Sequence, residues 1–348
     1  MNPNYQIKET EYEADYNPLA IQPDAHFTQS YQYGEWQKSI DRDVRRFVIQ
    51  KDDETIGTFQ TITFKLPLKQ NILCIPHGPT IKQVPDSDFL NSFGAFAKQL
   101  LNKEQAIFIR FDFFPSNLMH EVKFPRYIKK APAHIYHSAY FQPRNEWVLD
   151  LKHSSEEEML AHMHPKARYN ASLAERKGIT TEISKDLKTH FPYFWSLLQE
   201  TATRDHFHLQ PKIYYETVFR SSAEKQNAIL AIARHNGKIL AMNFVLCFGN
   251  TATFVYGGSS NEERNLMPSY LLQRETIREV KRLGYAYYNF GGITDGSKQY
   301  QSWEGFTVFK KKFGGEIRTC GESYDIVGKH VWYYLYDIQR RIKTLWRS

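Results

Sequence analysis

The side chains best suited to chemistry lie between Tyr288 and Gly315. A β-rich run ends there at a glycine pair, a polar loop follows, and three consecutive lysines then stand between Phe309 and Phe313, before a second glycine pair. Glycine pairs let backbone approach a ligand or another strand closely. The aromatic neighbours can hold at least one lysine cation partly out of water. This pattern indicates a site for a phosphate or for negative charge that develops during a reaction.

The elements that must position this segment form an internal repeat. Each copy is expected to contain three strands, a helix with apolar residues at helical spacing, and a final apolar strand. The first copy has strands at 46–50, 58–64, 73–76 and 106–112 and a helix at 88–102. The second copy has strands at 228–232, 239–246, 251–256 and 285–289 and a helix at 269–283. Its first two strands are joined through Asn236-Gly237, a favoured hairpin dipeptide. Because the elements follow one another at the same spacing in both copies, the sequence predicts a duplicated α/β domain.

Length and composition are consistent with two domains and a sizeable core. The chain has 348 residues, including 22 Tyr and 24 Phe, and a domain usually takes about 100–200 residues. The net charge of +7 favours polyanionic partners, although an ordinary soluble protein of high pI fits it equally well. Three widely spaced cysteines indicate neither a disulfide framework nor a zinc ligand set. The histidine pairs at 162/164 and 206/208 lie in polar surroundings, and no metal site is predicted.

The domain limits and the location of the protein follow from the same features. Residues 1–150, with a returning segment 318–348, are expected to form the first domain, and residues 151–317 the second. Residues 1–16 are polar and acidic, and no run approaches the roughly 18–20 apolar residues of a membrane-spanning helix. A cytoplasmic protein is therefore expected.

A basic helix is expected between His164 and Gly178, where glycine ends it. Lys166, Arg168 and Tyr169 stand at its start. There the free backbone N–H groups of a helix add to the side chains as an anion site. A solvated helix face is the alternative for the basic residues further along.

Five motifs, taken in order, resemble the FemABX family of non-ribosomal peptidyltransferases, which build interpeptide bridges in bacterial cell walls. These motifs are 110–115, 164–178, 256–259, 288–293 and 308–315. The resemblance implies an α/β (α+β) fold of two tandem acetyltransferase (GNAT)-like domains, with mixed sheets flanked by helices. Some members carry a long helical arm, but residues 151–315 lack the heptad pattern that such an arm needs. The compact, armless form is expected.

The resemblance also implies an activity. Family members are aminoacyltransferases that move an amino acid from aminoacyl-tRNA to the stem-peptide amine of a peptidoglycan precursor, either lipid II or UDP-MurNAc-pentapeptide. No cofactor is implied, since aminoacyl-tRNA is a co-substrate. The implied partners are aminoacyl-tRNA and the precursor, and the protein is expected to be a monomer that can contact the inner membrane surface peripherally.

The reaction is attack by an amine on an activated ester, which requires a neutral amine and a stabilised oxyanion. By resemblance, Lys310, which follows Phe309, corresponds to the lysine at the reaction centre. Lysines 310–312 are expected in a closing strand of the second domain, and a surface lysine in a basic strand is the alternative to the reaction-centre assignment of Lys310. Asp112 matches a carboxylate proposed as general base, or else is a strand-terminal aspartate that binds loop amides. Arg110, counted with the substrate-binding residues, lies on the same strand face, and an ion pair between the two would depress the pKa of Asp112 and weaken it as a base.

Precursor binding is assigned by resemblance as well. Tyr214 and Tyr256 fall where the family places tyrosines against the precursor, with core packing as the alternative, and Lys38 is a weaker candidate. Gln210 stands where the family has an arginine, and Ile107 where it has a tyrosine. Both departures bear on how diphosphate and peptide would be recognised.

Two other functions were compatible with the residues. A GNAT-like N-acyltransferase would use acyl-CoA, but residues 260–267 lack the glycine-rich pyrophosphate loop. A non-catalytic protein would bind tRNA or a membrane surface. Residues 331–347 mix apolar and basic side chains. Such a helix either lies on an anionic bilayer or docks on the first domain with its basic face in water.

Overall fold

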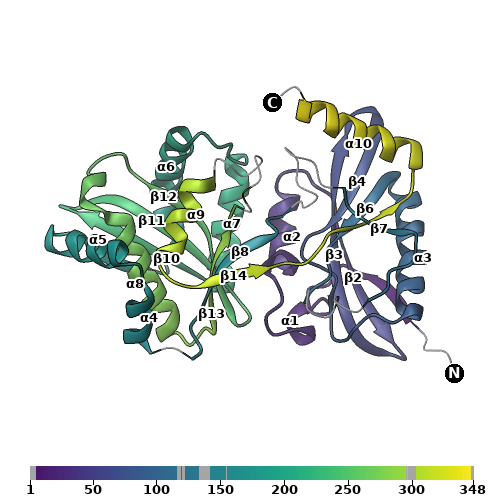
Figure 1. Ribbon diagram of the computed structural model, residues 1–348, viewed down its shortest axis with the longest axis horizontal. Helices are drawn as coiled ribbons and strands as arrows, with labels where there is room; N and C mark the ends of the chain where they lie inside the picture. Colours follow the sequence, from purple (N-terminus) through teal and green to yellow (C-terminus); the bar gives the residue numbers. More distant parts are fainter. Residues whose placement is uncertain are drawn as a thin grey trace. The chain divides into compact units, whose positions relative to one another are not determined.

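The computed structural model describes residues 5–115, 119, 122–132, 142–153, 155–294, 296 and 303–345. The chain divides into two compact units, each with its own sheet (Figure 1). The first unit takes residues 1–144, 295–301 and 319–348, and the second takes residues 145–294 and 302–318. Both units are mixed α/β structures, as expected.

The first unit is built on an eight-stranded sheet in the order β1-β2-β3-β4-β6-β15-β7, with β5 paired to β3. Its strands are β1 (Tyr5–Thr10), β2 (Val44–Lys51), β3 (Glu54–Leu66), β4 (Gln70–Ile75), β5 (Thr80–Ile81), β6 (Ala106–Phe111), β7 (Ile128–Lys130) and β15 (Tyr324–Val327). Its helices are α1 (Pro18–Ile21), η1 (Phe27–Gln29), α2 (Tyr31–Lys38), η2 (Pro67–Lys69), α3 (Ser87–Lys103) and α10 (His330–Leu345).

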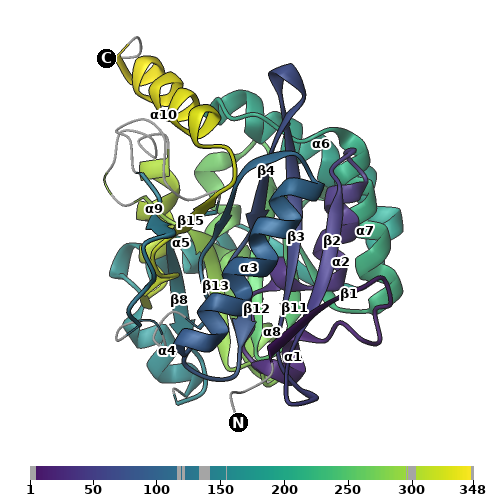
Figure 2. The same cartoon turned by 90° about the vertical axis from the view of Figure 1, so that its right-hand side faces the viewer.

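Helix α3 covers one face of this sheet (Figure 2). It begins at Asp86, whose side chain accepts a hydrogen bond from the Phe89 amide at 2.7 Å and so caps the helix. Its apolar side, including Phe93 and Leu100, is buried in the core of the unit. Every residue of β6 is buried. This strand lies at the centre of the unit, with α3 and α10 both packed against it.

The second unit has a seven-stranded sheet in the order β14-β8-β13-β12-β11-β10-β9. Its strands are β8 (Asn145–Asp150), β9 (Thr180–Ser184), β10 (Ala228–His235), β11 (Lys238–Phe248), β12 (Thr251–Ser259), β13 (Tyr287–Gly292) and β14 (Glu316–Thr319). Its helices are α4 (Glu156–His162), α5 (Pro165–Arg176), α6 (Leu187–Asp205), α7 (Lys212–Lys225), η4 (Arg264–Leu266), α8 (Pro268–Arg282) and α9 (Glu304–Lys311). None of the described helices is long and apolar enough to cross a membrane.

The predicted repeat is present in the topology. The series β2-β3-β4-α3-β6 and β10-β11-β12-α8-β13 each contain two antiparallel strand pairs followed, after the helix, by a parallel pair. The hairpin between β10 and β11 turns at Asn236 and Gly237, whose φ angles are 48° and 82°. Both residues are left-handed, as the favoured two-residue hairpin turn requires.

Two expectations from the sequence need correction. Residues 145–150 are expected in the first domain, but they form β8, which hydrogen-bonds to β13 of the second unit. Arg318, expected at the start of the segment that returns to the first domain, also belongs to the second unit. The lysine cluster at 310–312 was expected in a strand, but it lies at the end of helix α9. Phe309 and Phe313 are four residues apart, so both rings reach Tyr270 from one side of a helical turn.

Candidate functional site

Lys310 is held at the end of strand β13. Its Nζ donates a hydrogen bond to the carbonyl oxygen of Gly292 at 2.6 Å. The helix that carries it is tied to the same segment, because the Thr294 amide donates to Thr307 Oγ1 at 3.0 Å. Lys310 is half-buried. The lysine that the sequence analysis placed at the reaction centre is therefore fixed against backbone rather than extended into solvent.

The other two lysines of the cluster contact aromatic rings. Lys311 Nζ lies 5.4 Å from the centre of the Trp147 ring. Lys312 Nζ donates to the hydroxyl of Tyr270 at 3.2 Å. Because the three lysines have different partners, each can be tested separately by substitution.

Both glycine pairs are required by the local backbone. Gly291 has a φ of 74°, and its amide donates to Asn289 Oδ1 at 2.7 Å. This turn precedes Gly292, the acceptor for Lys310. Gly315 has a φ of 99°, and a Cβ on it would lie 2.6 Å from the carbonyl oxygen of Val148. The second pair thus allows the chain to pass close to β8, which only glycine permits.

Burial lowers the pKa of Lys310 to about 8, against the opposing charge of Glu146. Glu146 is itself buried, and its Oε2 accepts a hydrogen bond from Asn289 Nδ2 at 2.8 Å. With such a pKa, roughly a tenth of the lysine is neutral at pH 7. The site therefore offers a poorly solvated cation that can also release its proton near physiological pH.

Neither Glu146 nor Asn289 is among the residues predicted from the sequence. A signal is present for the carboxylate, because Glu146 and Val148 are two residues apart and so share one face of β8. A carboxylate that shares a face with an apolar residue is expected to be buried and paired.

Phe309 has a packing role. Its ring lies 5.1 Å from the rings of both Tyr270 and Phe313, between ring centres. It packs against the core cluster that includes Tyr288 and Phe290. These contacts anchor α9 and so set the position of the lysine that follows.

The two tyrosines assigned to precursor binding are in contact. Tyr256 OH donates to Tyr214 OH at 3.0 Å, and the ring of Tyr215 lies 5.2 Å from that of Tyr256. Tyr214 and Tyr215 are each 4% exposed, whereas Tyr256 is half-buried. The backbone N–H of Gln210 donates to Tyr215 OH at 3.4 Å. Tyr214 thus has the core packing that was the alternative assignment, and Tyr256 is the more accessible of the pair.

The three residues predicted to bind an anion at the start of α5 have different surroundings. Arg168 Nη1 donates to the carbonyl oxygens of Ala161 and Met163 at 2.7 and 2.6 Å, and so closes the end of α4. Lys166 and Tyr169 are exposed. Of the three residues predicted to bind an anion, Arg168 is engaged by the fold, and the other two are accessible.

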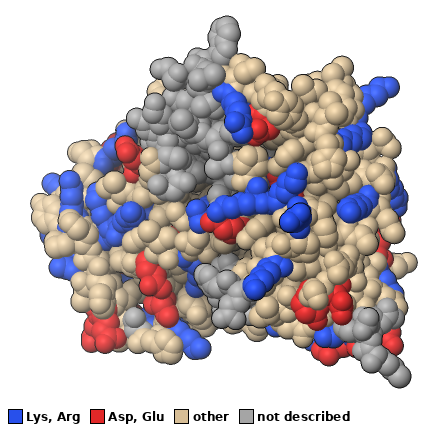
Figure 3. All heavy atoms as spheres, turned by 45° about the vertical axis from the view of Figure 1, so that its right-hand side comes forward, with Lys and Arg blue, Asp and Glu red and all other residues tan. Residues whose placement is uncertain are grey.

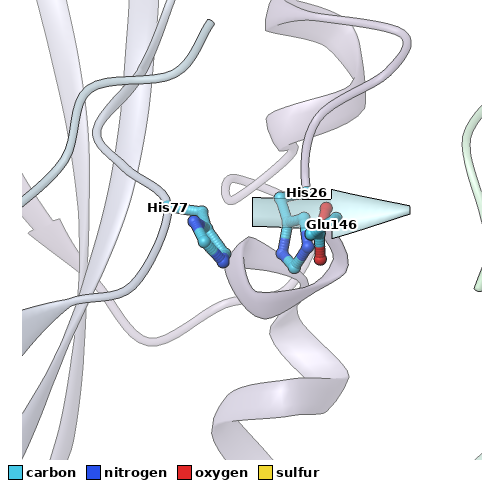
Figure 4. A group of neighbouring side chains, drawn as sticks. All are labelled: His26, His77 and Glu146. Atoms are coloured by element: carbon cyan, nitrogen blue, oxygen red, sulfur yellow. The ribbon is translucent and has the colours of Figure 1, made fainter. Parts of the chain in front are cut away.

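In the first unit, Asp112 follows β6 and binds a buried histidine. His77 Nδ1 lies 2.9 Å from Asp112 Oδ2, and the residues are 2% and 8% exposed. Burial raises the pKa of Asp112, and the hydrogen bond from His77 opposes the rise. His77 also packs on His26, with ring centres 4.1 Å apart (Figure 4). Asp112 is therefore held by an imidazole, a partner that sequence analysis did not identify.

Arg110 pairs with Asp325. Its Nε and Nη2 each lie 2.7 Å from a carboxylate oxygen, in the bidentate geometry that guanidinium groups favour. Arg110 is 4% exposed and Asp325 is fully buried. The ion pair joins β6 to β15, and such burial leaves little of Arg110 for contact with a substrate.

Lys38, the weaker precursor-binding candidate, lies at the end of α2. Its Nζ is 3.0 Å from Glu35 Oε1. It lines a polar hollow of about 300 Å³ together with Tyr31, Arg45 and Arg46. On the face drawn in Figure 3, Lys and Arg side chains are interspersed with Asp and Glu rather than forming one continuous basic field.

Known proteins resemble this chain over nearly its full length. The FemAB family model matches residues 132–238 and 220–341. The Lipid II:glycine glycyltransferase of Staphylococcus aureus (strain USA300) is 20% identical to this chain, and the match covers 90% of this chain and 91% of the relative. The solved structure of FemX matches with a TM-score of 0.79 and 19% identity, over 95% of this chain and 99% of FemX. A tandem GNAT protein from the clavulanic acid biosynthesis pathway matches with a TM-score of 0.55 and 10% identity, over 93% and 99% of the two chains.

Proposed function

Because this chain belongs to the FemAB family, we propose that it is an aminoacyltransferase that extends the interpeptide bridge of peptidoglycan. The donor is aminoacyl-tRNA, and the acceptor is the stem-peptide amine of lipid II or UDP-MurNAc-pentapeptide. The relative named Lipid II:glycine glycyltransferase supports the precursor as acceptor. The observation that carries the proposal at the level of residues is Lys310, a desolvated cation held at the end of β13.

In the proposed reaction the acceptor amine attacks the carbonyl carbon of the aminoacyl ester. A C–N bond forms, the carbonyl oxygen becomes an oxyanion, and the C–O bond to the tRNA ribose then breaks. The proton lost by the amine is balanced by the proton gained by the leaving ribose oxygen. The step therefore requires a donor aimed at the oxyanion and a route for one proton.

Lys310 is suited to the first requirement. An ammonium group has three N–H donors, and among the described residues Nζ donates to Gly292. Within the described part of the chain, the remaining donors are available for an oxyanion. Because the lysine is poorly solvated, its interaction with developing charge is stronger than that of a cation in water. Its pKa of about 8 leaves most of it protonated at pH 7.

The proposal is tested by incubating the protein with a set of charged tRNAs and each of the two precursors, followed by mass spectrometry. A mass increase of one aminoacyl residue on a precursor is expected with at least one tRNA. Transfer from acetyl-CoA without tRNA, or no product with any charged tRNA, would contradict the proposal. Lys310→Ala should abolish the product while Lys311→Ala, a neighbour on the same helix, retains it.

A further inference from the structure

Helix α10 exposes a line of apolar side chains. Val331, Tyr334, Leu335 and Ile342 are 73%, 65%, 48% and 46% exposed. Their spacing of three, four and seven residues places them on one side of the helix. We call these four residues the outer stripe. Single exposed apolar residues are ordinary, but an aligned set on one helix marks an interaction surface.

The opposite side of α10 is fixed to the first unit. The rings of Tyr333 and Tyr336 lie 5.2 and 5.3 Å from that of Phe108, between ring centres. Tyr333 OH also donates at 2.7 Å to Asp325, the carboxylate that binds Arg110. These contacts fix the rotation of the helix about its axis. The outer stripe is therefore held outward and is not a hydrophobic face waiting to turn into the core.

A basic residue of the described part of α10 flanks the outer stripe. Arg341 follows Tyr334 by seven residues and so lies beside the stripe; its side chain is 66% exposed and pairs with Asp337 at 2.9 Å. Arg340 instead lies over the ring of Tyr336, 5.0 Å from its centre, on the side of the helix that packs on Phe108. In the sequence, Lys343 and Arg347 follow, so residues 330–348 contain four Lys or Arg and a single acidic residue. An apolar stripe on a helix rich in Lys and Arg is typical of helices that lie in the interface of an anionic bilayer.

We propose that α10 docks on an anionic phospholipid bilayer, with the outer stripe inserted at the level of the head groups and Arg341 near the phosphates. A second copy of the chain fits the surface less well. Four side chains are far from the roughly 1,000 Å² that a stable protein interface needs. This inference rests on the proposed function, because a lipid-linked acceptor would be met at such a surface, and it makes the lipid-linked precursor the preferred acceptor.

The test is co-sedimentation of the full chain with vesicles of phosphatidylcholine alone or mixed with phosphatidylglycerol. Binding is expected only to the anionic vesicles, and it should weaken with salt. The double variant Leu335→Glu/Ile342→Glu should bind at least about tenfold more weakly. The control Leu283→Glu/Ile183→Glu changes two exposed apolar residues of the second unit, 45% and 38% exposed, with the same change in charge. The control should bind like the wild type.

Equal binding by the Leu335/Ile342 variant and the control would overturn the inference, as would no binding to anionic vesicles by the wild type. Dimerisation seen by size-exclusion chromatography and lost in the Leu335/Ile342 variant would also overturn it, in favour of a second copy. Circular dichroism melting of each variant checks that the helix remains folded.

Transfer assays separate this inference from the proposed function. The Leu335/Ile342 variant should aminoacylate soluble UDP-MurNAc-pentapeptide at the wild-type rate and lose activity on lipid II in vesicles. Undiminished transfer to lipid II by this variant would overturn the inference alone. If the wild type aminoacylates neither precursor but binds vesicles through the outer stripe, the proposed function fails and the inference stands.

Discussion

The two copies of the repeat differ at the end of their parallel strand pair. In the second unit, β12 and β13 pair over residues 251–253 and 287–289, and beyond them β13 continues to Gly292 paired on its other edge with β8. In the first unit, β4 stays paired with β6 up to Ile75 and Phe111. Beyond that point residues 112–114 hydrogen-bond to residues 78–81, so the pairing continues.

The charged side chains near these two strand ends also have different kinds of partner. The first unit has Arg110 bound to Asp325 and His77 bound to Asp112, so its buried charges face buried partners. In the second unit Lys310 hydrogen-bonds to a neutral carbonyl oxygen, and the opposite charge of Glu146 only partly offsets its desolvation. We expect the first strand end to contribute to stability and the second to carry a charge available for reaction.

The first prediction concerns the charges of the first unit. Asp325→Ala should lower the free energy of unfolding by about 3–5 kcal/mol, because it leaves Arg110 buried without its carboxylate. Urea denaturation measures the change. Glu262→Ala breaks an exposed pair with Lys238 in the second unit and should cost at most about 1 kcal/mol. Similar losses in both variants would show that the buried pair has no special role in stability.

The second prediction concerns the charge of the second unit. Lys310→Ala should reduce the single-turnover rate of aminoacyl transfer by about 100-fold or more, equivalent to about 2.7 kcal/mol in the barrier. Lys311→Ala should stay within about threefold of the wild type, since its interaction with the Trp147 ring is replaceable at the surface. A Lys310→Ala enzyme with unchanged turnover and unchanged melting temperature would rule out the catalytic assignment.

The third prediction is a pH dependence. The pKa of Lys310 is lowered to about 8, so its cation is lost as the pH rises through 8. The rate also depends on the neutral fraction of the acceptor amine, which rises with pH, so the wild type is compared with Lys310→Met, which has no titrating group at this position. If the cation stabilises the oxyanion, the ratio of the wild-type to the Lys310→Met single-turnover rate should fall about tenfold for each pH unit above 8. A ratio that rises above pH 8 would indicate that neutral Lys310 is the active form.

The smallest expected effect concerns the tyrosine pair. Tyr256→Phe removes the hydroxyl that donates to Tyr214 and should lower stability by about 1 kcal/mol. If Tyr256 also contacts the precursor, the KM for the precursor should rise while kcat is little changed. Thermal melting and steady-state kinetics on the same sample distinguish the two contributions. An unchanged KM would leave Tyr256 a packing residue.

Local pattern was sufficient for the repeat but not for the lysine cluster. The strands and helices of both copies follow from apolar periods of two and about 3.6 residues. Around Lys310, several Phe and β-branched residues also favour a strand, but the segment forms helix α9. The helix forms because Phe309 and Phe313 both pack on Tyr270, a contact that depends on the placement of α8.

Residues close together along the chain are enough to predict the elements of the duplicated domain and the hairpin at Asn236, because apolar periods and turn residues are local properties. The partners of the charged groups depend on the tertiary fold. Arg110 could have paired with Asp112 two residues away, yet its partner is Asp325, brought beside it by the pairing of β15 with β6. Glu146 likewise meets Asn289 only because β8 pairs with β13. Such choices depend on strand order, which local periodicity does not specify.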